Sequence, residues 1–527
     1  MAQVGVDKSQ KYDRQLRLWG DHGQKALESS HVCLVNASSV GTEVLKSLVL
    51  PGLGKFSIVD ENRVSGADAG CNFFLPASEI GKSRAEVACK YLCEMNEDVE
   101  GSAVELSTEN LLAKDVDYFK QFSCVIATHL PERDLVRLSE ACWRSNVPLL
   151  IVQCCGFVAY VRLQVAEHCV VEARPDNAPE DLRLDRPFPA LTEFLHTQNL
   201  STMDRKTHSH TPYVVLLHKF LEQWKEEHGT SMPSNYKEKT EFKKMLRKGI
   251  QVDENGVPAD EENFDEALAK ANGCLKLTSV PSDVLAILHD PCMENLSASS
   301  SNFWVLVNAL GVFAAEEGCL PLRGSLPDMT ADSERYITIQ TIYRQKAAED
   351  ADRVWRHAQS ICRELKKDPS SISQEETKVF CKNAAFLRVL RSRSFAEEVQ
   401  KPSMLSADID DGLGREDPHM NIYLFIRAAF RFYEQHGHYP GGEEDDLLLF
   451  KELVTTMTTE WNVSAPSCEA TMTSLVASKG SELPSVTGFV GALVSQEVIK
   501  LLTCQFMPFN NTLIYSAKLA STATFQL

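Results

Sequence analysis

No two cysteines in this sequence are spaced as C-x-x-C, although the chain has 16 cysteines among its 527 residues. Structural zinc sites usually take their ligands from such pairs, so we expect no zinc site. The opening residues, MAQVGVDKSQ, lack the apolar stretch of a secretory signal. Without a signal, the natural environment is the cytosol or the nucleus, where thiols stay reduced. The sequence therefore predicts free cysteines and no metal.

Long hydrophobic runs are also lacking. A membrane-spanning helix needs roughly 18 apolar residues, and the best candidate, Pro148 to Val165, is interrupted by Gln153 and Arg162. We therefore expect no transmembrane segment. With 43% hydrophobic residues, a chain of this length can bury two or three globular domains.

Cations are scarce relative to acids. Lys and Arg number 54 against 73 Asp and Glu, so the net charge is −19. This excess disfavours nucleic acid as a partner. It is compatible either with binding to basic protein surfaces or with solubility alone.

Glycines are missing from the turn of a predicted strand–turn–helix–strand unit, which runs from His31 to Asp60. In nucleotide-binding units this turn reads G-x-G-x-x-G, and its bare backbone lies against a phosphate at the helix N-terminus. Here Asn36, Ser38 and Ser39 occupy the turn, and only the last glycine, Gly41, remains. We interpret the unit as a nucleotide-binding fold that has lost its phosphate site. The alternative is an ordinary α/β unit that never bound a nucleotide.

Two further motifs flank this unit. KYDRQLRLWG, residues 11–20, places Tyr12, Leu16 and Trp19 on one helical face and leaves Arg14 elsewhere on the surface. EIGKSRAEVA, residues 79–88, places Lys82 at a helix start, where it could meet an anion or remain solvated.

Together these motifs resemble the adenylation (ThiF/MoeB-like) domains of the enzymes that activate ubiquitin and its relatives. Members of this family share Y-x-R-Q near the N-terminus and G-K-x-[KR]-A-E downstream. Asp60 and Lys82 match the residues of active members, whereas the second acid is Asn62 and the phosphate-binding arginine is Cys71. The L-D-N motif of active members is also absent, since the chain reads THLP from Thr128. The chain thus resembles the inactive half of a paired activating enzyme.

The resemblance implies a role for Arg14. In related enzymes the arginine of Y-x-R-Q reaches across to the ATP phosphates in the other subunit. We expect Arg14 to act in trans in this way, with a local salt bridge as the alternative. This chain should then bind no cofactor of its own, because its site is degenerate at Asn36, Ser38, Ser39 and Cys71, and ATP and Mg should bind in the partner subunit.

The predicted fold class is α/β, with a discontinuous Rossmann-like domain and a large insertion. Alternating apolar runs and helical patterns continue to about residue 166 and return after residue 483. Residues 167–482 are mostly helical, and we expect them to resemble the catalytic-cysteine domain of the family. The longest helical pattern, Asp332 to Lys367, has no internal Gly or Pro.

Candidate partner contacts lie in this insertion. HSHTPY contains His208 and His210, which lack further metal ligands nearby and which we interpret as surface or interface residues. The amphipathic segment after Pro327 suggests either core packing or a subunit contact through Asp332, Tyr336 and Tyr343. The acidic run from Glu443 to Asp446 is typical of a solvated turn.

Within the family, a separate inactive half of this size is most similar to the branch that serves neddylation. The implied heterodimer adenylates the C-terminal glycine of a ubiquitin-like modifier, forms a thioester on the partner's cysteine and transfers the modifier to a conjugating enzyme. Of the cysteines here, Cys155 is the most tempting nucleophile, but no base is adjacent in sequence. The resemblance also implies binding to the cytoplasmic tail of amyloid precursor protein, a cytoplasmic and nuclear location, and a peripheral membrane fraction through such a partner.

Two other classes of protein remain open. The chain could be a free-standing adenylating enzyme, which the lost glycines and Cys71 oppose. It could be a Rossmann oxidoreductase, since Asp60 is in place to bind a ribose. The lost glycines oppose that class too.

Overall fold

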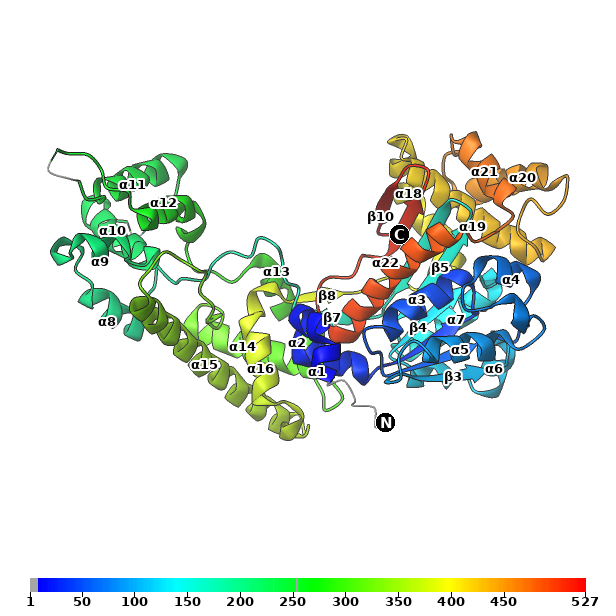
Figure 1. The fold of residues 1–527 in the computed structure, drawn as a ribbon, viewed down its shortest axis with the longest axis horizontal. Coiled ribbons are helices and arrows are strands. Elements are labelled where there is room, and N and C mark those ends of the chain that lie inside the picture. Colours follow the sequence, from blue (N-terminus) through cyan, green and yellow to red (C-terminus); the bar gives the residue numbers. More distant parts are fainter. Residues whose placement is uncertain (1–7, 231, 253–254) are drawn as a thin grey trace, which may run out of the picture. The chain divides into compact units, whose positions relative to one another are not determined.

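The computed structural model describes residues 8–230, 232–252 and 255–527. These residues form two compact units (Figure 1). Unit 1 comprises the chain up to Val170 and from Val389 to Leu527, and unit 2 is Val171–Arg388.

Unit 1 is built on an eight-stranded sheet with the order β10-β9-β6-β5-β4-β1-β2-β3. Its strands are β1 (His31–Val35), β2 (Lys55–Val59), β3 (Glu100–Val104), β4 (Cys124–Thr128), β5 (Leu149–Cys155), β6 (Val158–Gln164), β9 (Thr512–Ser516) and β10 (Ser521–Phe525). Strands β1 to β5 run parallel, and each later strand is antiparallel to its neighbours. Every residue of β4 and β5 is buried, as expected for strands covered on both faces. The α/β fold class is confirmed.

Helices cover both faces of this sheet. The helices of the first face are α2 (Asp13–Glu28), α3 (Ser39–Val49), α5 (Arg84–Cys93) and α22 (Pro484–Thr503), and those of the second include α7 (Glu132–Arg144) and α19 (Pro418–His436). On the first face, Leu34 shares a core with Val44 and Val494. On the second, Val125 packs in a core with Phe425.

The described part of unit 1 has seven further α-helices. They are α1 (Lys8–Lys11), α4 (Gly66–Cys71), α6 (Thr108–Lys114), α17 (Phe395–Gln400), α18 (Ser406–Gly414), α20 (Asp446–Trp461) and α21 (Glu469–Ser478). Of these, α17, α18, α20 and α21 contribute to the core on the second face of the sheet. Two further strands, β7 (His168–Val170) and β8 (Arg388–Leu390), pair with each other.

Helix α22 has the length and the apolar composition of a membrane span, with a mean hydropathy of 1.3 over its most apolar window. However, 61% of that window is buried within the protein. Val490 and Val494 lie in the same core as Leu45 of α3. The helix therefore fits the description of a core helix of unit 1.

The chain returns to the first unit at Val389, whereas the sequence predicted a return near residue 483. The difference arises because α19 is not part of the insertion. Its residues Ile422 to Phe430 are all buried and belong to the core that covers the second face of the sheet. A helical pattern shows which residues face a core but not which core they face.

A buried charged cluster attaches these helices to the sheet. Arg162 on β6 donates to Glu398 of α17 at 2.7 Å, and Arg427 of α19 also pairs with Glu398. Arg427 reaches Glu132 of α7 at 2.8 Å, and the Tyr423 hydroxyl donates to Glu398 at 2.9 Å. The Arg162, Glu398 and Arg427 side chains are each at most 1% exposed, so their charges compensate one another in a dry interior.

Unit 2 is almost entirely helical. Its helices are α8 (Pro189–Thr197), α9 (Arg205–Ser209), α10 (Tyr213–His228), α11 (Tyr236–Lys248), α12 (Glu262–Cys274), α13 (Ser282–Leu288), α14 (Asn302–Glu317), α15 (Ser333–Glu364) and α16 (Gln374–Lys382). The long helix α15 has 32 residues, close to the predicted length. The helical character predicted for this part of the chain is confirmed.

Candidate functional site

The candidate site lies at the carboxyl ends of the central parallel strands of unit 1. Asn36 follows β1, Asp60 follows β2 and His129 follows β4. Strand order reverses between β1 and β4, and open α/β sheets bind their ligands in the crevice at such a point. The N-terminus of α3 opens into the same place.

A carboxylate of the chain itself occupies the N-terminus of α3. The backbone N–H of Ser39 donates to Glu482 Oε2 at 2.6 Å, and that of Val40 donates to Glu482 Oε1 at 3.0 Å. His129 Nε2 lies 3.2 Å from Glu482 Oε1. An anion at this position is stabilised by the unpaired N–H groups and the helix dipole. Glu482 therefore takes the place that a phosphate takes in nucleotide-binding relatives of this fold.

Local structure holds Glu482 there. Glu482 pairs with Gly156 in a parallel β-bridge, and the Gly156 N–H donates to Ser481 O at 2.8 Å. Burial by itself would raise the pKa of Glu482. The charge and hydrogen bond of His129, with the backbone amides of α3, lower that pKa below its ordinary value of 4.5. The group is therefore held as a carboxylate.

The turn itself is closed by side chains. Asn36 has a φ of 69°, a conformation that asparagine tolerates better than most residues, and its Nδ2 donates to Thr128 O at 2.7 Å. Ser38 Oγ donates to Thr128 Oγ1 at 2.9 Å and accepts from Gly41 N at 3.3 Å. A Cβ on Gly41 would lie 2.8 Å from the Leu34 side chain, so this glycine is retained for close packing of helix and strand. Asn36 and Ser38 thus lie where they were predicted to lie.

Asp60 is fully engaged by neighbours. Its Oδ2 accepts from Arg84 Nε at 2.6 Å and from Ala37 N at 2.9 Å. Its Oδ1 accepts from the backbone and side-chain nitrogens of Asn62, both at 2.9 Å. No acceptor position is left for a ribose hydroxyl.

Sequence reasoning did not identify Arg84, which organises this side of the crevice. Besides Asp60, Arg84 pairs with Asp68 at 3.2 Å and donates to Asn36. The signal was present, since Arg84 occupies the [KR] position of the G-K-x-[KR]-A-E motif. Lys82, the residue singled out there, is 64% exposed and pairs with Glu79 of the same loop.

Cysteine chemistry is disfavoured around the crevice. Cys71 is the last residue of the short helix α4, and burial raises the pKa of its thiol to about 11. Cys155 is fully buried at the end of β5, and burial raises its pKa to about 12. A thiol with such a pKa is not a thiolate at neutral pH. All sixteen cysteines are free, as predicted.

Arg14 lies on the surface of α2. Its side chain is exposed and makes no hydrogen bond or ion pair within residues 8–230, 232–252 and 255–527. Its neighbour Arg17 pairs with Asp13 at 3.0 Å. Tyr12 anchors the start of the helix, being 2% exposed and donating to Asp98 at 2.9 Å. The alternative reading of Arg14 as a local salt bridge thus finds no support in the described part of the chain.

The two predicted interface motifs meet within unit 2. Asp332 caps α15 through Arg335 N, and its own N–H donates to His210 O at 3.0 Å. Arg335 joins the motifs, because its guanidinium donates to Thr211 Oγ1 at 2.9 Å. His210 is exposed, and Tyr336 is partly exposed, with its hydroxyl near Pro327 O. Their contact with a partner stays a prediction.

Two residues of these motifs were predicted wrongly. Tyr343 is completely buried, and its hydroxyl donates to Leu182 O at 2.6 Å, so it packs in the core of unit 2 and cannot touch a partner. His208 is 3% exposed, stacks on Phe264 and pairs with Glu261 at 2.7 Å. The error for Tyr343 arose because an amphipathic helix face looks the same whether a core or another subunit covers it. The error for His208 arose because its partner, Glu261, is remote from it in the sequence.

We predict that Tyr343→Phe destabilises unit 2 by about 1–2 kcal/mol, since the buried Leu182 carbonyl loses its donor. The measurement is urea denaturation followed by circular dichroism. Tyr336→Phe is the control, because its hydroxyl makes only a 3.4 Å contact at the surface and should matter little. Unchanged stability of Tyr343→Phe would contradict the core assignment.

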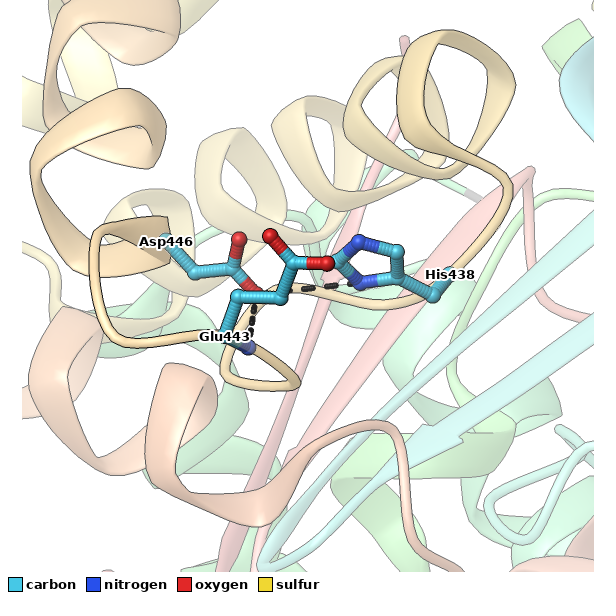
Figure 2. Close-up of side chains that lie close together, drawn as sticks. All are labelled: His438, Glu443 and Asp446. Carbon is cyan, nitrogen blue, oxygen red and sulfur yellow. Dashed lines mark hydrogen bonds and ion pairs between the residues drawn. The ribbon is translucent and has the colours of Figure 1, made fainter.

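One cluster resembles a metal site. His438, Glu443 and Asp446 place ligand atoms within 4.8 Å of one another (Figure 2). The sequence predicted a solvated turn here, but Asp446 is buried. Its carboxylate accepts from Gly441 N at 2.8 Å and from Glu443 N at 3.0 Å. These bonds close the turn before α20, and they account for the burial of the carboxylate. We assign the cluster a structural role.

Comparison with known proteins agrees with this geometry. Residues 12–526 match the ThiF family. The chain is 47% identical over 535 residues to the NEDD8-activating enzyme E1 regulatory subunit of Gallus gallus and 47% identical over 533 residues to that of Xenopus laevis, and 100% of each chain is covered. The Drosophila melanogaster protein of this name is 40% identical over 528 residues, covering 99% of this chain and 98% of that protein. The chain therefore belongs to the ThiF family and, within it, to the NEDD8-activating enzyme E1 regulatory subunits.

Proposed function

We propose that this chain is the non-catalytic subunit of a heterodimeric enzyme that activates a ubiquitin-like modifier, NEDD8. The partner subunit binds ATP and Mg, adenylates the C-terminal glycine of the modifier and takes it as a thioester on its own cysteine before transfer to a conjugating enzyme. The observation that carries this proposal is the closed crevice, in which Glu482 lies at the phosphate position and Arg84 donates a hydrogen bond to Asp60.

A free-standing adenylating enzyme is disfavoured by charge as well as by space. The Glu482 carboxylate would repel a triphosphate at the N-terminus of α3, where the helix dipole and free amides attract anions. The second acid and the phosphate-binding arginine of active members are replaced by Asn62 and Cys71. The same closure disfavours a Rossmann oxidoreductase, because a dinucleotide needs both the α3 N-terminus and Asp60. Neither ATP nor a dinucleotide should bind this chain.

The partner contact should be large. An inactive half leaves exposed the surface that its counterpart covers, so we expect an obligate heterodimer with an interface above about 2,000 Å². His210, Asp332 and Tyr336 remain candidates for contacts from unit 2. The modifier itself and the cytoplasmic tail of amyloid precursor protein are further proposed partners, and the proposed location is cytoplasmic and nuclear, with a membrane fraction only through a membrane-protein partner.

The test is reconstitution. The chain purified alone should show no modifier-dependent ATP–pyrophosphate exchange, and addition of the catalytic subunit should give exchange together with a stable 1:1 complex in size-exclusion chromatography. Exchange by the chain alone, or tight binding of a nicotinamide dinucleotide in calorimetry, would overturn the proposal.

We propose that Arg14 serves the partner's site. Adenylation builds negative charge on the phosphates, which a guanidinium from outside can bind in bidentate fashion. Arg14→Ala should leave the heterodimer intact and slow pyrophosphate exchange about tenfold or more, as for other arginines that act in trans.

The matched control is Arg17→Ala, which removes an exposed arginine of the same helix that is already paired with Asp13. Its complex should exchange pyrophosphate at the wild-type rate. Equal rates for the Arg14→Ala and wild-type complexes would exclude a role in trans.

A further inference from the structure

Helix α11 carries a concentration of positive charge in a chain whose net charge is −19. Six of its thirteen residues are cations, against two acids. The cations, which we call the basic face, are Lys237, Lys239, Lys243, Lys244, Arg247 and Lys248. Nothing in the proposed activating function uses them.

The fold points this face outward and keeps it in place. Phe242, Met245 and Leu246 are buried in a core to which α10 and α12 also contribute. The three helices are drawn in Figure 1. Asn235 caps the helix by accepting from Glu238 N at 3.0 Å. The basic face is therefore presented on a packed helix rather than on a loop.

The cations have no partners within the described parts of the chain. No ion pair or side-chain hydrogen bond involves any of the six there. Of the two acids of the helix, Glu238 is engaged by Ser234 and Asn235, and Glu241 lies 3.7 Å from His228. By contrast, Arg353 elsewhere in unit 2 forms ion pairs with two carboxylates, those of Glu316 and Glu317. The six cations of α11 thus exceed its two acids, and none of the six is paired in the described residues.

A shallow hollow of about 520 Å³ runs along one side of this helix. It is lined by Tyr236, Lys237, Thr240, Glu241, Lys244, Met245 and Lys248, with Glu227 of α10. Lys237 and Lys244 are two turns apart, about 10 Å along the axis, and Lys248 follows one turn later. Tyr236, which is 87% exposed, offers a ring at the open end. Lysines spaced in this way can each meet a separate carboxylate.

We propose that the basic face of α11 is a docking site for an acidic segment of a protein partner, one rich in Asp and Glu. Charge complementarity is the argument, since six unpaired cations on a rigid helix attract carboxylates and steer their approach.

Two other anionic ligands fit less well. A membrane-binding helix needs an exposed apolar face, and that of α11 is buried in the core of unit 2. Nucleic acid is disfavoured by the acidic chain as a whole and by the Glu227 and Glu241 carboxylates at the hollow. An acidic peptide can place its carboxylates on the lysines and leave these two positions free.

The experiment uses the full-length chain and a fluorescein-labelled decaglutamate peptide, with binding followed by anisotropy at 0.15 M salt. The triple variant Lys237→Glu, Lys244→Glu and Lys248→Glu should weaken binding about tenfold or more, because three attractions become repulsions. The matching Lys→Gln triple, which is milder for folding, should give a smaller loss. Both variants should melt at the wild-type temperature.

The control reverses three lysines of unit 1 that are also exposed and unpaired in the described residues, Lys25, Lys114 and Lys120. This control has the same net charge as the first triple variant but keeps all six cations of α11. It should therefore bind the peptide as the wild type does. If the control weakened peptide binding as much as the α11 triple variant does, net charge alone would explain the effect, and the proposal would be overturned. The proposal would also be overturned if oligothymidylate or phosphatidylserine vesicles bound more tightly than the peptide in a way that depends on α11. It would fail as well if the wild type did not bind the peptide.

Discussion

Replacing Glu482 with alanine should lower the free energy of unfolding of unit 1 by roughly 3 kcal/mol and should create an anion site where none is accessible in the wild type. The Glu482 side chain is only 9% exposed, and its carboxylate accepts from Ser39 N and Val40 N and lies 3.2 Å from His129 Nε2. Without it, two amides at a helix N-terminus lose their acceptor and the His129 imidazole loses its ion-pair partner. Those groups are the elements of a phosphate site.

The two effects are measured separately. Urea denaturation followed by circular dichroism gives the loss of stability, and Glu469→Ala, which removes a carboxylate that is 72% exposed, should cost little. Millimolar pyrophosphate should then raise the melting temperature of Glu482→Ala but not that of the wild type, because a ligand stabilises only the fold that binds it. A variant as stable as the wild type and indifferent to pyrophosphate would refute the role given to Glu482.

The pH dependence follows from the lowered pKa of Glu482. A carboxyl whose pKa is lower in the folded than in the unfolded state contributes its full stability above the unfolded value, here about 4.5, and loses it as the pH falls through the folded value. The difference in stability between wild type and Glu482→Gln should therefore be constant near neutral pH and shrink below about pH 4.5. A difference that grows with acid would contradict the sign of this shift.

Removing Glu398 should have the largest effect on stability, a loss of roughly 5 kcal/mol, because it leaves the buried cations of Arg162 and Arg427 without their shared acceptor. The Tyr423 hydroxyl loses its acceptor as well. We expect Glu398→Ala to be largely unfolded or to melt far below the wild type, as measured by circular dichroism and limited proteolysis.

The neighbouring Glu397→Ala is the control. Glu397 is 38% exposed and its carboxylate lies 3.6 Å from Lys401, so its removal should cost under about 1 kcal/mol. A second test replaces Arg162, Glu398 and Arg427 together with methionine, which removes all three charges and should recover much of the lost stability. If Glu398→Ala and Glu397→Ala melted at the same temperature, the cluster would not hold the helices to the sheet as described.

Local pattern was enough for much of the fold. The strands that precede Asn36, Asp60 and His129, the helix that begins at Ser39 and the helical character of unit 2 all follow from apolar periodicity over a few residues. The degenerate turn was also readable from the sequence, because the absence of a glycine is a property of one position. Together with the Tyr12 and Lys82 motifs it indicated the family.

The residue that closes the crevice could not be predicted from the sequence. Glu482 lies far along the chain from Ser39, in a segment without any motif, and only the pairing of its residue with Gly156 brings it to the α3 N-terminus. The return of the chain at Val389 and the burial of Tyr343 were missed for a related reason. Periodicity shows that a face is covered but not by what, since the covering partner is chosen by packing between distant segments. The loss of the phosphate-binding turn can be seen in the few residues from Asn36 to Gly41. The carboxylate that fills the vacant position becomes evident only in the folded chain, because its place depends on where two remote segments meet in space.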